Sequence, residues 1–301
     1  MATAGGALPG SLITPLEPGS PPVSRGSVQP AAQGLQSKHS TPWARIDAAV
    51  ASSCGTQHEA NEDAHSAVDG SGQLFVVADG VGGGAMAQWA SRQLVGLLHQ
   101  ALDARPLDAA VVCRAMLDAD RSIARHIAQL SDAPGAATVA LCASVDALAS
   151  KWLVAWVGDC RVYRLALGGA GGIDLLTRDD TFGHLGELPP SGGSLDDPAR
   201  MVGNGATSGA NAVWHDLRRG DLLVLCSDGV HKYLTSDDWA TLLNQPVALA
   251  RRCADLITRA RANGSSDDAT VLLLQRSDGG APRRRWMARW LDAVMTRGTR
   301  R

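Results

Sequence analysis

The stretch Leu74-Phe75-Val76-Val77-Ala78-Asp79-Gly80-Val81 places an acidic residue directly at the end of an apolar run. The same pattern returns in Leu222-Leu223-Val224-Leu225-Cys226-Ser227-Asp228-Gly229-Val230. Each apolar run predicts a buried strand, and a carboxylate at the rim of a core is costly to ionise without compensation. The glycine that follows each acid lets the backbone turn sharply. Both stretches therefore predict a strand that ends in a functional turn.

Two further acidic clusters, Asn61-Glu62-Asp63 and Asp267-Asp268-Ala269-Thr270, also border predicted strands. No matching lysine stands directly beside these four strand ends. Acids gathered without a basic partner favour a site for a hard cation built from oxygen ligands. A metal-dependent enzyme is therefore the leading interpretation.

Composition sets the broad class of the protein. The 301 residues are 45% hydrophobic, which is enough for a sizeable core, and the formal net charge of -2 gives no reason to expect a nucleic-acid partner. The six cysteines form no C-x-x-C pair, and most lie in apolar stretches, as reduced buried thiols do. With no signal pattern and no apolar run of about 18 residues, we expect a cytoplasmic protein, and a monomer.

The chain divides into three parts. Residues 1–42 are rich in Pro, Gly, Ser and Ala, so we expect them to be disordered. Residues 43–277 carry the regular patterning of a folded domain. Residues 278–301 hold many arginines, with Trp286, Trp290 and Leu291 at helical spacing. This tail could be a basic amphipathic helix that contacts a membrane or a partner, a closing helix packed on the domain, or a frayed end.

Hydrophobic periodicity places the elements of the domain. It predicts strands over 46–52, 63–69, 73–78, 137–144, 152–157, 161–165, 173–176, 212–215, 221–227 and 269–275, and helices over 85–102, 112–130, 236–243 and 246–262. The short turns within 137–176 favour an antiparallel meander. Periodicity vanishes over 178–211, a length typical of a functional lid or flap. Strands, a helix pair, more strands and more helices indicate an α+β domain.

Seven motifs, in this order, resemble those of the metal-dependent serine/threonine protein phosphatases of type 2C, in particular the bacterial branch. The resemblance covers residues 44–276 and rests on Asn61-Glu62-Asp63-Ala64, Ala78-Asp79-Gly80-Val81-Gly82-Gly83, Gly135-Ala136-Ala137-Thr138, Val157-Gly158-Asp159-Cys160-Arg161-Val162-Tyr163, Leu176-Thr177-Arg178-Asp179-Asp180, Cys226-Ser227-Asp228-Gly229-Val230 and Asp267-Asp268-Ala269-Thr270. It implies a four-layer α-β-β-α sandwich, in which two antiparallel sheets are flanked by helix pairs.

The resemblance also implies a catalytic centre with two Mg²⁺ or Mn²⁺ ions. Asp79 would bridge the ions and the Gly80 carbonyl would complete one coordination shell. Asp228 and Asp267 would hold the other ion, with Asp79, Asp228 and Asp267 as the catalytic acids. Glu62 and Asp63 would act through bound waters. A water activated by both metals would attack phosphorus in line with the departing serine or threonine oxygen.

Two interpretations of Asp159 stay open, because this acid either contributes to a third, weaker metal site or caps the turn at Gly158. His58 departs from the family pattern, which commonly has a phosphate-binding arginine three residues before the Asn-Glu-Asp motif. A histidine is mostly neutral at pH 7, so we expect KM for a phosphopeptide to rise between pH 6 and 8 more steeply than in His58→Arg. The alternative is a surface His58, with the phosphate held by metals alone.

The sequence thus predicts a phosphatase that acts on phosphoserine and phosphothreonine in proteins and opposes a cognate serine/threonine kinase. One alternative is a catalytically weak relative that serves as a phosphoprotein-binding regulatory module. Another is hydrolysis of small phosphate esters. The flap (residues 178–211) distinguishes this last function from protein dephosphorylation, because protein substrates need a recognition surface beside the metals.

Overall fold

Strands of two antiparallel sheets form the centre of the protein. The computed structural model describes residues 35–40, 44–56, 58–68, 73–103, 106–130, 134–166, 173–205, 207 and 209–278. One sheet has the strand order β1 (Leu35–Ser40), β2 (Ala44–Ser53), β11 (Ala269–Asp278), β10 (Leu222–Cys226), β7 (Arg161–Leu165) and β8 (Asp174–Leu175). The other has the order β3 (Ala64–His65), β4 (Leu74–Val81), β5 (Ala136–Ser144), β6 (Lys151–Val157) and β9 (Asn211–Asp216).

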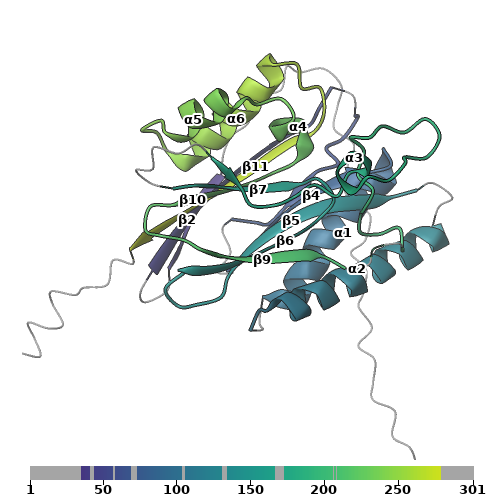
Figure 1. Cartoon of the computed structure of the whole chain (residues 1–301), viewed down its shortest axis with the longest axis horizontal. Coiled ribbons are helices and arrows are strands. Elements are labelled where there is room, and N and C mark those ends of the chain that lie inside the picture. Colours follow the sequence, from purple (N-terminus) through teal and green to yellow (C-terminus); the bar gives the residue numbers. More distant parts are fainter. Residues whose placement is uncertain are drawn as a thin grey trace, which may run out of the picture. The chain divides into compact units, whose positions relative to one another are not determined.

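Helices cover the outer face of each sheet (Figure 1). The helices of the described residues are α1 (Ala85–Leu102), α2 (Ala109–Leu130), α3 (Phe182–Leu185), α4 (Asp228–His231), α5 (Ser236–Leu243) and α6 (Leu249–Ala262), of which α3 lies in the flap and α4 is a single turn after β10. The pair α1 and α2 packs on the β4–β5 side, and the pair α5 and α6 packs on the sheet that contains β2 and β11. The four-layer α-β-β-α sandwich expected from the sequence is confirmed.

Strand β4 shows why these sequences form layers. Side chains alternate across a strand, so Val76 and Ala78 face α1 and α2 while Phe75 and Val77 face the other sheet. All four are buried. A strand covered on both faces reads as an unbroken apolar run, which is the pattern seen in the sequence from Leu74 to Ala78.

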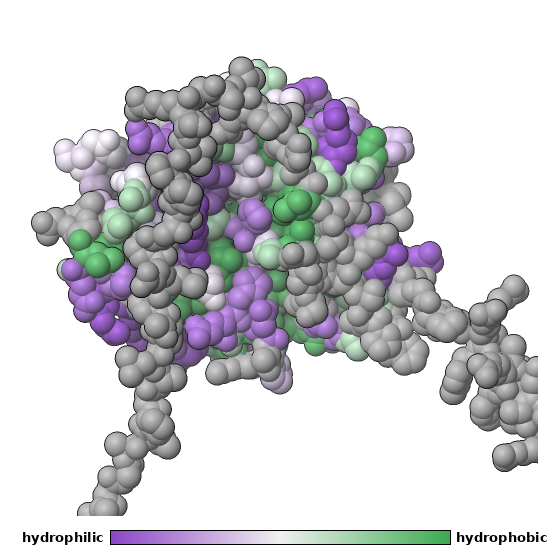
Figure 2. Space-filling view, turned by 180° about the vertical axis from the view of Figure 1, so that it is seen from behind, coloured by the Kyte–Doolittle hydropathy of each residue, from purple (hydrophilic) through white to green (hydrophobic). Residues whose placement is uncertain are grey.

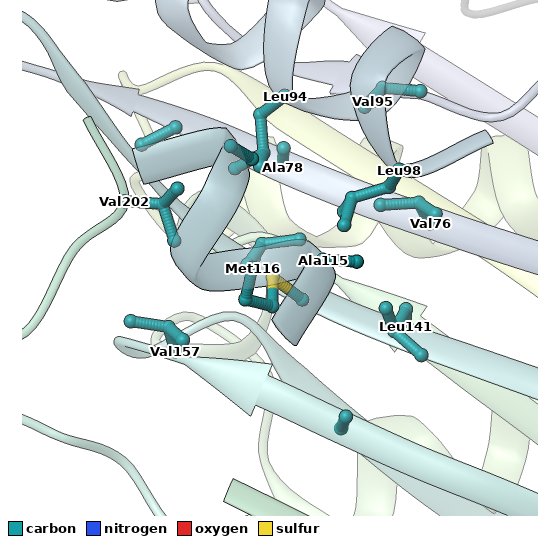
Figure 3. Close-up of a cluster of buried hydrophobic side chains, with 14 of the residues drawn as sticks. Val76, Ala78, Leu94, Val95, Leu98, Ala115, Met116, Leu141, Val157 and Val202 are labelled. Atoms are coloured by element: carbon teal, nitrogen blue, oxygen red, sulfur yellow. The ribbon is translucent and has the colours of Figure 1, made fainter. Parts of the chain in front are cut away.

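The core between the helices and the second sheet is shown in Figure 3. Leu94 and Leu98 of α1 and Met116 of α2 reach Val76 and Leu141 of the sheet. These side chains have at most 1% of their surface exposed. The predicted range 85–102 matches α1, because its apolar residues recur at helical spacing.

The opposite core lies under α5 and α6. Leu222, Val224 and Cys226 of β10 point to this side, where Trp239 of α5 packs against Tyr163 at a ring-centroid distance of 5.2 Å. Thr235 caps α5 by accepting from the Asp238 backbone N–H, and the Asp238 carboxylate accepts from Thr235 in return. This capping box satisfies two free N–H groups at the helix start, and the predicted range 236–243 is confirmed.

The predicted meander over 137–176 is wrong. β5 pairs with β6, but β7 crosses to the first sheet and pairs with β10 and β8. Gly158 makes the crossing possible, because its φ of 93° lies in the left-handed region that favours glycine and because a Cβ there would lie 2.5 Å from the Thr138 side chain. The place beside β6 is taken by β9.

Two other expectations need correction. Disorder is expected over residues 1–42, but residues 35–40 form β1, which pairs antiparallel with β2, and the rest of that range lies outside the described residues. The strand predicted over 63–69 shrinks to Ala64–His65, and directly after it the Ser66 hydroxyl, rather than a backbone carbonyl, accepts from the Val76 backbone N–H. The predicted basic tail, 278–301, lies outside the described residues apart from Asp278.

The flap has structure of its own. It contains α3, and Thr181 pairs with Pro198 while Val202 pairs with Ala137. Asp179 to Thr181, near the start of the flap, are buried. The Asp179 carboxylate accepts three hydrogen bonds of 2.7 to 3.2 Å from Arg161, which anchor the flap to the sheet.

On the face drawn in Figure 2, hydrophobic residues lie in several separate patches between hydrophilic ones. Within the described part of the chain, we find no helix with both the length and the apolar character needed to cross a membrane.

Candidate metal centre

Acids from distant parts of the chain meet where strands end. Asp79 lies near the end of β4, Asp228 begins α4 directly after β10, and Asp267 precedes β11. Asp159 lies in the crossing between β6 and β7, and Glu62 and Asp63 precede β3. The charges of Asp63, Asp228, Asp159 and Asp267 all act on Asp79. The structure thus brings together every acid that the sequence analysis selected for metal binding.

Asp63 is held by a short chain of hydroxyl and amide groups. Its Oδ2 accepts from Ser227 Oγ at 2.8 Å, and that hydroxyl accepts from the Thr270 backbone N–H at 3.0 Å. Its other oxygen, Oδ1, is buried and has no hydrogen-bond partner among the described residues. Burial raises the pKa of Asp63 to about 8, and the charges of Asp268 and Asp228 contribute. Such an unpaired buried oxygen is suited to a cation or a cation-bound water.

Asp79 is the central acid of the cluster. Burial raises its pKa well above the ordinary value, and the neighbouring carboxylates, Asp63 first, raise it further. Like charges at this spacing disfavour ionisation, and a divalent cation would remove that penalty.

Lys232 is a partner that sequence reasoning missed. Its Nζ donates to Asp228 Oδ2 at 2.7 Å and to Asp159 Oδ2 at 3.3 Å. Burial disfavours ionisation of Asp228, but the charge and hydrogen bond of Lys232 outweigh it, so the pKa of Asp228 is lowered. A signal was present, because a lysine four residues after Asp228 lies on the same side of a helical turn.

Asp159 is almost fully buried beside α4. Burial raises its pKa to about 6, the charge of Asp228 adds to this, and Lys232 opposes it. His231 Nε2 donates to the Asp159 backbone carbonyl at 2.9 Å. Burial lowers the pKa of His231 to about 4, so this histidine is neutral at pH 7.

His58 faces acids rather than open solvent. Its Nδ1 lies 3.1 Å from Asp268 Oδ2 and 3.8 Å from Asp267 Oδ1. One possible metal-ligand atom from each of His58, Asp267 and Asp268 lies within 4.8 Å of the other two. Burial alone would lower the pKa of His58, but the hydrogen bond to Asp268 and the nearby carboxylates raise it. The pH-dependent KM stays a prediction, as does the role of His58 in holding phosphate.

Asp268 organises the loop that carries these groups. Its two oxygens accept from the backbone N–H groups of Gly55 and Glu62, each at 2.7 Å. Glu62 is also buried, and its Oε1 accepts a hydrogen bond from the Gly84 N–H at the start of α1. Burial raises the pKa of Glu62. Asp268 was quoted in a motif but not selected as a site residue.

Arg261, near the end of α6, holds the Asp267 loop from behind. One guanidinium nitrogen donates to the carbonyls of Ser265 and Asp267, and another donates to the carbonyls of Ser53 and Cys54. Sequence reasoning missed this arginine because its partners are backbone atoms, which no motif records.

The two glycines after the strand-end acids allow close backbone approach. A Cβ on Gly80 would lie 2.5 Å from the Ala87 carbonyl oxygen, and one on Gly229 would overlap the Asp268 carbonyl oxygen. The close approach explains why both acids are followed by glycine.

We expect Gly229→Ala to lower the free energy of unfolding by about 3 kcal/mol, because the added methyl group overlaps backbone. The matched control is Gly96→Ala in α1, where a Cβ meets no atom within 4 Å. Helix propensity predicts a gain of roughly 0.5–1 kcal/mol there. Urea unfolding measures both, and an unchanged Gly229→Ala would show that this approach is looser than described.

The donor set fits a divalent metal. Carboxylate and carbonyl oxygens are the ligands that Mg²⁺ and Mn²⁺ favour, and the carboxylates of Asp63, Asp159, Asp228 and Asp267 lie near that of Asp79. Lys232 balances only the side that contains Asp159 and Asp228. The arrangement can therefore hold a metal next to Asp79 and Asp63.

Comparisons with known proteins agree with this architecture. "Serine/threonine phosphatase stp" of Listeria welshimeri is 26% identical over 220 residues, which are 68% of this chain and 84% of the relative. The catalytic domain of the serine/threonine protein phosphatase PstP, in complex with two manganese ions, is similar with a TM-score of 0.66 at 24% identity, over 78% of this chain and 100% of that one. PstP/Ppp of Mycobacterium tuberculosis gives 0.65 at 24% identity, over 76% and 98%.

The structural likeness establishes the fold, and a family model carries the assignment further. The model described as protein phosphatase 2C matches residues 51–267, well over half of the chain. That segment contains every acid of the cluster. The chain therefore belongs to the protein phosphatase 2C family of serine/threonine phosphatases.

Proposed function

We propose that this protein removes phosphate from phosphoserine and phosphothreonine in proteins, with the help of two Mg²⁺ or Mn²⁺ ions bound at the acid cluster. The observation that carries the proposal is the convergence of Asp79, Asp228 and Asp267 around a buried, unpaired Asp63 oxygen. The names of the Listeria relatives, and the two manganese ions in the PstP structure, support it. A cognate serine/threonine kinase would supply the phosphorylated substrate.

The residues of the acid cluster would have two roles at the metal centre. Asp79, the Gly80 carbonyl, Asp228 and Asp267 would bind the ions, and Glu62 and Asp63 would act through coordinated waters. The chemistry that the ions supply when bound is a water of lowered pKa and neutralised charge on the phosphoryl oxygens. Ser227 keeps the Asp63 carboxylate in place, and Asp268 fixes the loop that carries Glu62 and His58.

The experiment that tests the proposal is hydrolysis of a phosphothreonine peptide by the full chain with Mn²⁺, with Mg²⁺ or with a chelator. We expect turnover with either metal and none with the chelator. A folded, metal-loaded protein without turnover would contradict the proposal and favour a phosphoprotein-binding module. Hydrolysis that is unaffected by the chelator would contradict the role of the metals.

The flap supports a protein substrate, because it exposes large apolar side chains. Leu188 is 91% exposed and Leu195 is 55% exposed. Exposed leucines of this kind are candidate contacts for a protein surface.

We expect a Leu188→Asp, Leu195→Asp double variant to raise KM for a phosphothreonine protein about tenfold, because burying a leucine is worth roughly 1.5–3 kcal/mol. Turnover of an aryl phosphate should be unchanged, since that substrate is too small to reach both leucines. The matched control is Leu148→Asp, 50% exposed between β5 and β6. Equal losses with both substrates would favour the small-ester function.

A further inference from the structure

The position of Lys232 carries an inference about how many ions the centre holds. Lys232 follows α4, and its backbone N–H donates to the Asp228 carbonyl at 3.1 Å. Its side chain then turns back, so that Nζ contacts both Asp228 and Asp159. The side chain of Asp159 is 4% exposed and that of Asp228 is 19% exposed, whereas that of Lys232 is 37% exposed. The lysine therefore enters from the solvent side and covers the buried Asp159 and the half-buried Asp228.

Two carboxylates that contact the same ammonium group repel each other unless a cation lies between them. Nζ of Lys232 is that cation here, 2.7 Å from Asp228 Oδ2 and 3.3 Å from Asp159 Oδ2. Among the described residues, ion pairs with Asp159 and Asp228 come from Lys232 alone. The nearby His231 is neutral at pH 7, and its Nε2–H donates a hydrogen bond to the Asp159 backbone carbonyl.

We infer that Lys232 is a built-in cation that takes the place of a third metal ion between Asp159 and Asp228. The inference rests on the proposed function, because it presupposes that the rest of the cluster binds metal. It also bears on the two interpretations of Asp159, since the Asp159 carboxylate is in contact with the Lys232 ammonium group.

Electrostatics explains why the lysine keeps a third ion out. A divalent cation between Asp159 and Asp228 would have to occupy the place of the Lys232 ammonium, which contacts both carboxylates, and the two positive charges would repel each other at that distance. The ordinary pKa of a lysine ammonium group, about 10.4, already lies well above neutral pH. The ammonium group is therefore protonated at every pH at which the enzyme is assayed.

The pairing also positions Asp228 for the remaining metals. The ammonium group binds Oδ2 of Asp228, which restrains the carboxylate and leaves Oδ1 available to a metal. In this respect Lys232 is a positioning residue, whose effect on the reaction passes through Asp228.

The test counts Mn²⁺ sites on the full chain by equilibrium dialysis with electron paramagnetic resonance of free Mn²⁺. We compare wild type with Lys232→Met, which keeps the length and loses the charge, and with Lys232→Arg, which keeps the charge. Lys151→Met, an exposed lysine at the start of β6, is the matched control. Circular dichroism and thermal unfolding show which variants are folded, and Lys232→Gln serves if Lys232→Met is not.

We expect two ions in wild type, Lys232→Arg and Lys151→Met, and a third in the neutral variants. Adding Asp159→Asn to Lys232→Met should remove that third ion again. Two ions in a folded Lys232→Met or Lys232→Gln, or three in wild type, would overturn the inference while leaving the proposed function intact. No bound Mn²⁺ in wild type would overturn the proposed function itself.

Discussion

The Asp79→Asn variant is expected to lose roughly 1,000-fold or more in kcat/KM for a phosphothreonine peptide. A metal that polarises the reacting groups supplies several kcal/mol of transition-state stabilisation, and about 4 kcal/mol corresponds to 1,000-fold. Asp79 is surrounded by the other cluster acids, so its amide would weaken binding of both proposed ions at once.

The same substitution should have the opposite effect on stability without metal. The pKa of Asp79 is raised in the folded protein by burial and by neighbouring carboxylates. An acid whose pKa is raised on folding destabilises the folded state above its unfolded pKa, and the penalty fades as the pH falls. Asparagine carries no charge, so the metal-free variant should unfold at a higher temperature than wild type at pH 7.5.

The matched control is Asp120→Asn. Asp120 is a buried acid of α2 that accepts from the backbone N–H groups of Gly203 and Gly205 through a single oxygen. An asparagine can keep that oxygen as acceptor, so we expect nearly normal activity. Asp79→Asn with wild-type activity, or with a lower melting temperature in chelator, would show that Asp79 is not the electrostatic centre of the site.

The second large effect concerns the metal itself. At a Mn²⁺ concentration of about 100 Kd, one bound ion adds about 2.7 kcal/mol to the free energy of unfolding. For a domain of this size that corresponds to an increase of roughly 5 to 10 °C in Tm. Differential scanning calorimetry with Mn²⁺ and with chelator measures the increase.

Two comparisons make the melting experiment specific. NaCl at the same ionic strength reports general screening of the acids, and Asp79→Asn reports loss of ligands. We expect the increase to shrink by more than half in Asp79→Asn and to persist in Asp120→Asn. An increase that is equal in all three proteins would place the bound metal outside the acid cluster.

The sequence predicted the elements well where one physical signal dominates. Helix α1 follows from apolar residues at helical spacing, and α5 from its apolar face behind Thr235. The strands that are buried on both faces are visible as unbroken apolar runs, as in β4 and β10. The convergence of the acids could be predicted only through the order of the motifs, because no local pattern brings residue 63 to residue 227.

What the sequence could not predict depends on contacts between distant segments. Nothing in the short turn at Gly158 shows that β7 leaves one sheet for the other, since the choice is made by β9 and β10, far along the chain. Lys232 was passed over because it stands four residues from Asp228 rather than beside it. The contact of its Nζ with Asp159 is between residues 73 positions apart.

The most direct measurement is the anomalous scattering of Mn²⁺ in crystals of the full chain grown with MnCl₂. The account predicts two strong peaks beside Asp79, with Asp228 and Asp267 among their ligands, and no peak between Asp159 and Lys232. Crystals of the folded protein without a peak at the acid cluster would contradict the metal centre on which the proposed function rests.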